Sequence, residues 1–174
     1  VPSTDRSHPE NLAQEGNREA IKTAAIYGAN AAGKSAVIRA FVAAIMAVRT
    51  SDTRNITQKI PGMVPFKFDE ETAKAPCSFE FFFVANDGIP YRYGFTADSD
   101  RVQEEYLYFY TSARASRVFE RTGDEFDFNQ ASKSTFSEYE EKNTSNKFFL
   151  ATVTNWGNAK TAPAYQWLAN AIDV

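Results

Sequence analysis

The chain has 174 residues, the length of a single globular domain, and it is 43% hydrophobic and 24% charged. This composition excludes a collagen, a coiled coil and disorder along the whole chain. Lys and Arg number 19 against 22 Asp and Glu, so the net charge of -3 gives no overall positive field that would attract nucleic acid, although a local basic patch stays open.

The few chemically special residues limit the kinds of site. Cys77 is the single cysteine and His8 the single histidine, so the sequence predicts neither an internal disulfide nor a zinc site built from Cys and His. Neither residue has a partner for nucleophilic catalysis. No apolar run reaches the ~18 residues of a membrane span, and no signal-peptide pattern is present. We therefore expect a reducing, cytoplasmic location and no membrane partner.

The first 50 residues divide into a polar leader and a strand-to-helix unit. Residues 1–21 are polar and nonperiodic, which predicts a loop with a short helix around 11–14. Residues 22–50 predict a strand at 23–27, a tight loop and a helix at 35–48. The helix is apolar on nearly every face, so we expect it to be buried on more than one side. A parallel strand should follow through a right-handed crossover.

The next part is typical of an antiparallel sheet. After a polar surface loop at 50–62, residues 63–128 predict a β subdomain whose strands alternate apolar and polar side chains, at 78–85, 90–97, 102–111, 117–121 and 125–128. Turn residues stand at 86–88 and 122–124. Most of the 15 Phe and 8 Tyr favour the packed face of this sheet. Stacking on nucleic-acid bases is the alternative, which the acidic neighbours disfavour.

The last part, residues 129–174, predicts a connector and short helices. Residues 129–146 are polar and charged, as in a mobile connector or weak helix. Two short helices are predicted at 147–156 and 162–172. The fold class is therefore α/β, with a strand-loop-helix unit beside an antiparallel, aromatic-rich β meander.

One motif carries chemistry. Residues 28–35, GANAAGKS, match G-x-x-x-x-G-K-[ST], the phosphate-binding loop of nucleotide-binding proteins. Glycines allow the sharp turn and the close approach of backbone amides to phosphate, Lys34 adds a positive charge, and Ser35 supplies a hydroxyl to Mg²⁺. The helix that follows directs its positive end at the same phosphates. We predict that a nucleotide is bound by Gly28, Asn30, Ala31, Ala32, Gly33, Lys34, Ser35 and Ala36.

The remaining candidates are weaker. Asp87 ends an apolar strand as a Mg²⁺ ligand would, but Gly88 and a returning strand follow at once, so a hairpin turn is favoured. Gln58 is a candidate nucleotide-sensing residue in a polar loop. The acidic pairs at 104–105 and 140–141 are interpreted as solvated surface charges. No catalytic residue is assigned.

Several segments together resemble a known family. They are AAIYGANAAGKSAVIRAF, VPFKFD, PCSFEFFFVANDGIPYRYGF, EEYLYFY and VFER, spread over residues 22–156. They are similar to the ABC-type, SMC-like ATP-binding proteins of bacterial abortive-infection and anti-phage defence systems, a group allied to the overcoming-lysogenisation-defect nucleases. The asparagine at position 30 matches the one common in SMC-like loops. The resemblance implies ATP and Mg²⁺ as cofactors, a second copy as partner, and a nuclease or other effector under control.

The sequence also departs from this family. A signature motif, an acidic Mg²⁺-binding strand with a catalytic glutamate, and a switch histidine are missing, as is the opening strand. The start at Val1 rather than Met agrees with a first lobe of a larger ATPase. We therefore expect weak binding and poor hydrolysis of ATP by this chain alone. Two other interpretations stay open: an SMC-like recombination or repair ATPase that loads on DNA, and a scaffold for which nucleotide is only a structural ligand.

Overall fold

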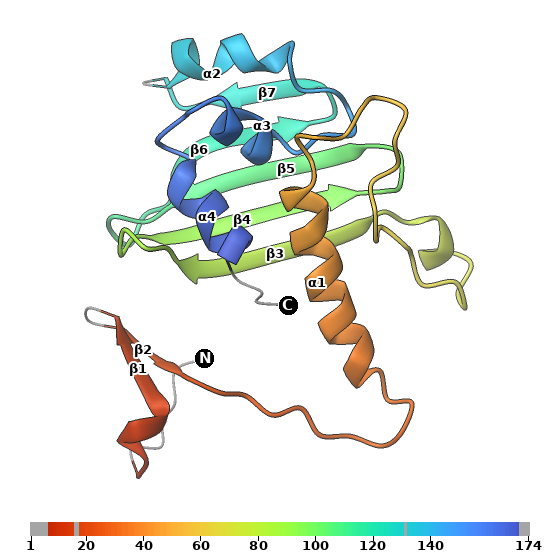
Figure 1. Cartoon of the computed structure of the whole chain (residues 1–174), viewed down its shortest axis with the longest axis vertical. Helices are drawn as coiled ribbons and strands as arrows, with labels where there is room; N and C mark the ends of the chain where they lie inside the picture. The colour runs from red at the N-terminus through yellow and green to blue at the C-terminus, as the bar shows by residue number, and fades with distance from the viewer. Residues whose placement is uncertain (1–6, 16–17, 131, 171–174) are drawn as a thin grey trace. The chain divides into compact units, whose positions relative to one another are not determined.

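The computed structural model describes residues 7–15, 18–130 and 132–170, and it forms two compact units, Val1–Ile38 and Arg39–Val174. In the first unit a 3-10 turn (Pro9–Asn11) precedes a hairpin of β1 (Leu12–Glu15) and β2 (Arg18–Ile21) (Figure 1). The predicted helix around 11–14 is therefore wrong. In the sequence, the Gly16-Asn17 pair is typical of a turn, although these two residues lie outside the described part of the chain.

The segment before the phosphate-binding loop differs from its prediction. Residues 23–27 belong to no strand and are exposed, with Tyr27 91% accessible. A strand exists only when a neighbouring strand pairs with its backbone, and no strand in the described part of the chain pairs with this segment. The predicted strand at 23–27 and its right-handed parallel crossover are therefore wrong for this structure.

The second unit is built on one antiparallel sheet with neighbours in chain order. Its strands are β3 (Cys77–Val84), β4 (Pro90–Ala97), β5 (Val102–Phe109), β6 (Ser116–Thr122) and β7 (Glu125–Phe128). All five were predicted within two residues at each end. The β3–β4 turn contains Gly88 and the β6–β7 turn contains Gly123. Both glycines have positive φ, where an L side chain would be strained.

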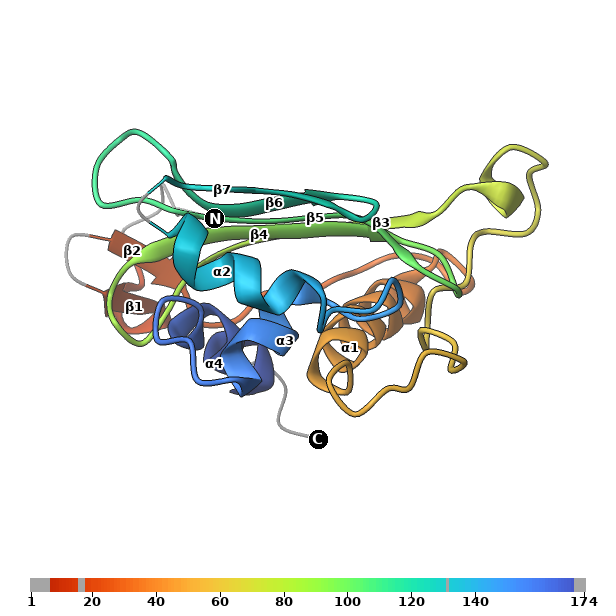
Figure 2. The same cartoon turned by 90° about the horizontal axis from the view of Figure 1, so that it is seen from above.

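Helices cover one face of this sheet. They are α1 (Lys34–Arg49), α2 (Lys133–Glu140), α3 (Phe149–Asn155) and α4 (Ala162–Asn170). Figure 2 shows α2, α3, α4 and the second half of α1 in one layer beneath the strands. The helices predicted at 147–156 and 162–172 are confirmed as far as residue 170, and the weak helix within 129–146 is α2. None of the described helices has the length and hydropathy that a membrane span requires.

The core lies between the sheet and these helices. Three pairs of aromatic rings join the two layers, with distances measured between ring centroids. Phe95 lies 4.7 Å from Phe148, and Phe119 lies 5.1 Å from Phe149. Phe83 stacks on Trp167 at 4.0 Å. The aromatic surplus of the sequence is thus mostly a packed interior, as predicted.

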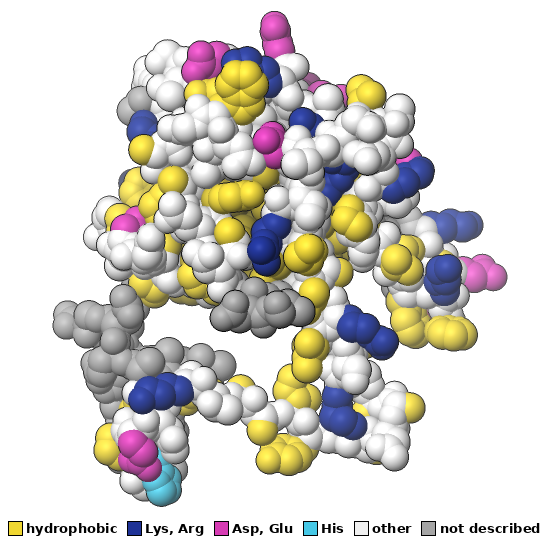
Figure 3. Space-filling view, in the orientation of Figure 1, with side chains coloured by type: hydrophobic (Ala, Val, Ile, Leu, Met, Phe, Trp, Pro, Cys, Tyr) yellow, Lys and Arg dark blue, Asp and Glu magenta, His cyan; other side chains and the backbone are white. Residues whose placement is uncertain are grey.

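Helix α1 is buried only in its second half. Ala44, Ile45, Ala47 and Val48 are inaccessible, whereas Val37 and Ile38 are 58% and 61% exposed. The expectation that the whole helix is buried on more than one side is wrong, because only the second half packs against the core of the second unit. Figure 3 shows the apolar side chains that remain visible along α1.

The other face of the sheet carries a row of polar and aromatic side chains. Glu80 on β3 accepts hydrogen bonds from Arg92 Nε on β4, at 2.8 Å, and from the Tyr106 hydroxyl on β5. Tyr106 reaches Glu80 by lying across Gly94, where a Cβ would meet the phenol ring. Gly94 therefore leaves room for a contact that joins three strands.

Candidate functional site

The phosphate-binding loop owes its shape to two residues in the left-handed region. Ala31 has φ 64° and Gly33 has φ 85°. Left-handed residues within a turn aim successive amides toward one side, which creates an anion-binding concavity. A hypothetical Cβ on Gly33 meets nothing within 4 Å, so glycine is needed there for its backbone conformation rather than for space.

Ala31 is the one described residue other than glycine with positive φ. Alanine in this region costs on the order of 1–2 kcal/mol. Strain of this kind persists at functional sites, where the surroundings hold the backbone in place. The motif alone does not reveal it, because position 31 is variable in the pattern.

Gly28 contributes differently from the prediction. Its φ lies outside the left-handed region, and a Cβ there would meet the Ala32 Cβ at 3.5 Å, an ordinary van der Waals distance. The sharp turn of the loop is made at Ala31 and Gly33 instead.

Lys34 closes the loop on itself. Its Nζ donates hydrogen bonds to the carbonyl oxygens of Gly28 and Ala29, each at 2.7 Å. The ammonium group therefore lies over the loop whose amides would hold phosphate.

Helix α1 begins at Lys34, and the first amides of a helix have no intrahelical acceptor. The amides of Ala36 and Val37 bond to the Gly33 carbonyl, while Ser35 exposes its side chain beside them. The loop, the lysine and the start of the helix fit a nucleoside triphosphate with its Mg²⁺. The backbone amides and Lys34 would hold phosphate oxygens, and Ser35 would hold the metal.

No other metal site is apparent: within residues 7–15, 18–130 and 132–170, no three His, Cys, Asp or Glu side chains come together to hold an ion. Asp87 belongs to a hairpin turn, as predicted. Its Oδ1 accepts the amide of Ile89 at 3.0 Å and its Oδ2 accepts the hydroxyl of Tyr91 at 2.8 Å. Burial, and then this hydrogen bond, raise the pKa of Tyr91.

Gln58, the candidate sensing residue, makes local contacts in the loop that follows α1. Its Oε1 accepts the amide of Asn55 at 2.8 Å, and its carbonyl accepts a hydrogen bond from Asn146 Nδ2 at 2.8 Å. Buried Arg54 donates to the Ala47 carbonyl of α1 and to the Asn146 carbonyl. The loop that contains Gln58 is therefore fixed between the end of α1 and the segment before α3.

Glu105 corrects one prediction from the sequence. It was interpreted as a solvated charge beside Glu104, yet its side chain is fully buried. Its carboxylate accepts the amides of Phe149, at 2.6 Å, and Leu150, at 3.0 Å, and the Tyr93 hydroxyl at 3.0 Å. Its position opposite Phe95 in the alternating pattern was a signal for the inner face.

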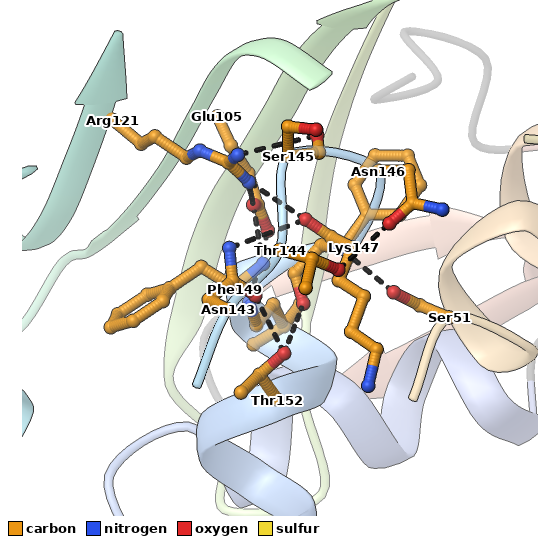
Figure 4. A network of polar contacts seen from close by, with 12 residues as sticks. Ser51, Glu105, Arg121, Asn143, Thr144, Ser145, Asn146, Lys147, Phe149 and Thr152 are labelled. Atoms are coloured by element: carbon orange, nitrogen blue, oxygen red, sulfur yellow. Dashed lines mark hydrogen bonds and ion pairs between the residues drawn. The ribbon is translucent and has the colours of Figure 1, made fainter. Parts of the chain in front are cut away.

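Arg121 completes this network, which Figure 4 shows at the start of α3. Its Nη1 lies 4.0 Å from Glu105 and donates to the Lys147 carbonyl at 2.7 Å. Burial raises the pKa of Glu105, while Arg121 and the three hydrogen-bond donors oppose that rise. The buried pair of Glu105 and Arg121 fixes α3 to the sheet. The sequence alone does not predict it, because charged residues are rarely so buried.

The loop at 28–35 leads directly into helix α1 of an α/β chain, with left-handed residues at Ala31 and Gly33. Residues 24–170 match the model of a family described as "AAA domain, putative AbiEii toxin, Type IV TA system". The chain therefore belongs to this family, whose context is abortive infection and toxin–antitoxin systems. No curated protein and no solved structure matches the chain.

Proposed function

We propose that this protein is the ATP-binding part of an ABC-type, SMC-like ATPase that acts as a nucleotide-dependent switch in anti-phage defence. The observation that carries the proposal is the loop at 28–35, with Ala31 and Gly33 left-handed and Lys34 lying over it, in a chain of the abortive-infection family. Its amides and Lys34 bind the phosphates, and Ser35 ligates Mg²⁺. A bound Mg²⁺ would supply positive charge that neutralises the phosphate groups.

The switch works through assembly. ATP holds two copies of the chain together through its γ phosphate and thereby controls an effector, such as a nuclease. The toxin named in the family description supports an effector. The resemblance of the sequence segments to proteins allied to the overcoming-lysogenisation-defect nucleases is the reason for proposing a nuclease. We assign no catalytic residue in this chain.

The test is a calorimetric titration of the protein with MgATP, with sedimentation of the same samples. Lys34→Ala should weaken ATP binding by at least tenfold, because it removes a charge from the phosphates (about 1.4 kcal/mol). The control is Lys67→Ala, which removes an exposed lysine from a different loop. ATP affinity unchanged by Lys34→Ala would refute the proposal.

Two further measurements separate the alternatives. Binding of DNA that falls steeply with salt would favour a repair ATPase. Thermal stabilisation by ATP without Mg²⁺-dependent turnover in the complete protein would favour a scaffold.

A further inference from the structure

Two arginines of the second unit are buried, and their surroundings differ. Arg121 lies 4.0 Å from the carboxylate of Glu105. Arg54, in the loop that follows α1, is only 4% exposed, and within the described part of the chain no Asp or Glu forms an ion pair with it. A buried guanidinium without a counter-charge is uncommon, because charged side chains are rarely buried unless they are paired.

Arg54 uses part of its guanidinium to hold the end of α1. Its Nη1 donates to the Asn146 carbonyl at 2.7 Å, and its Nη2 donates to the Ala47 carbonyl at 3.0 Å and to the Thr50 hydroxyl at 3.4 Å. These acceptors are neutral, and a carbonyl at the end of a helix supplies only a partial negative charge. The Nε–H group has no acceptor among the described residues. Arg54 therefore keeps an unused donor and a positive charge that no carboxylate balances.

A cavity of about 360 Å³ lies beside Arg54, in the loop that leaves the end of α1 in Figure 1. It is lined by Thr50, Thr53, Arg54, Gln58, Lys59 and Pro61. All six residues belong to the second unit, as do the residues that accept hydrogen bonds from Arg54, so the geometry of the cavity is set within that unit. Its volume falls in the range of small-molecule sites, roughly 300–1,000 Å³.

The side chains that line the cavity offer mainly N–H donors. The Oε1 atom of Gln58 accepts the Asn55 amide at 2.8 Å, which leaves Nε2 of the same side chain to donate. Lys59 pairs with Asp100, and its ammonium group has further N–H groups to donate. The two threonine hydroxyls give their protons to backbone carbonyls. Donors from three side chains, one of them a buried cation without a counter-charge, are suited to an oxyanion.

We propose that this cavity binds a phosphate group, either as the free ion or as part of a small phosphate ester. Arg54 supplies the positive charge and its Nε–H group, and Gln58 and Lys59 donate to further phosphate oxygens. The cavity shares no residue with the loop at 28–35, since it lies at the end of α1 and that loop leads into its start. Bound phosphate provides the counter-charge of Arg54 and thereby stabilises the loop between α1 and α3.

Calorimetric titration of the full chain with inorganic phosphate, at an ionic strength held constant with chloride, tests the site. Gln58→Glu keeps the oxygen that accepts the Asn55 amide but places a carboxylate at the cavity, so it should weaken phosphate binding about tenfold. The new carboxylate also gives Arg54 a counter-charge, so the Tm without phosphate should not fall. Gln166→Glu is the matched control, because Gln166 is exposed on α4 and its Oε1 also accepts a hydrogen bond, from Asn86 at 3.1 Å. It should leave phosphate affinity unchanged.

Two further titrations locate the phosphate and identify its source. Lys34→Ala should leave phosphate binding at the cavity intact, which separates this site from the one proposed for ATP. Tighter binding of glycerol 3-phosphate than of inorganic phosphate would identify an ester as the ligand, and the reverse order would identify the free ion. A chain that binds no phosphate, phosphate binding that is lost in Lys34→Ala, or an affinity that Gln58→Glu does not change would overturn the proposal.

Discussion

Replacing Glu105 with glutamine removes its negative charge and one of its two acceptor oxygens while keeping its shape, and it thereby tests how much they stabilise the fold. The carboxylate accepts from Phe149 N through one oxygen and from Leu150 N and Tyr93 Oη through the other. Glutamine keeps the shape but turns one acceptor into a donor, so at least one buried N–H loses its partner, which costs about 1–3 kcal/mol. Arg121, also fully buried, loses its counter-charge but keeps three carbonyl acceptors.

The expected loss of stability is about 3 kcal/mol, toward the low end for a broken buried pair, because glutamine also avoids the burial of a charge. This corresponds to a fall in Tm of about 10 °C for a domain of this size. Urea unfolding followed by circular dichroism measures the difference. The control is Glu104→Gln, next in sequence but exposed, which should change stability by less than about 0.5 kcal/mol. A loss below about 1 kcal/mol for Glu105→Gln would refute the reasoning.

The pH dependence of the Glu105→Gln difference has a definite sign. Because burial raises the pKa of Glu105 above its ordinary 4.5, the folded state binds its proton more tightly than the unfolded state does. The part of the stability that is linked to this proton is therefore complete below pH 4.5 and is lost as the pH rises through the raised pKa. The difference in free energy of unfolding between wild type and Glu105→Gln should therefore become smaller as the pH rises over that range.

Other positions give independent tests. Gly94→Ala should cost about 1–3 kcal/mol in urea unfolding, since its methyl group displaces Tyr106, and a cost near zero would contradict the close approach. Burial and the hydrogen bond to Glu80 raise the pKa of Tyr106 to about 12, so Tyr106→Phe should remove the step near pH 12 from a near-ultraviolet titration; the stability linked to this phenol is complete below pH 10 and lost through pH 12. Gly33→Ala should weaken ATP binding about five- to thirtyfold by calorimetry, through about 1–2 kcal/mol of backbone strain, whereas Ala31→Gly should not weaken it; the reverse order would contradict the loop geometry.

The sheet of the second unit was predictable because its determinants are local. Alternating side chains mark each strand, and glycine turns such as those at 88 and 123 join strands that are neighbours in the chain. The phosphate-binding loop was predictable for the same reason, since its eight residues are contiguous. Short-range patterns decided both.

The predictions that were wrong concern residues whose structure depends on partners distant in the sequence. The segment 23–27 has the composition of a strand, but pairing depends on a partner that its own residues do not specify. Glu105 has the composition of a surface residue, and its burial depends on Arg121 and on two amides of α3 that are more than 40 residues away in sequence. Distant partners, not propensities, determine both outcomes.

The carboxylate at the start of α3 also has a consequence for the order of folding. A helix of seven residues is too short to form alone in water, and the acceptor for its first amides sits on β5, 44 residues earlier. Helix α3 therefore becomes stable only after β5 has taken its place in the sheet. Because such contacts close a long loop, we expect the sheet to be well ordered in the folding transition state and α3 to join late, so that Glu105→Gln chiefly accelerates unfolding.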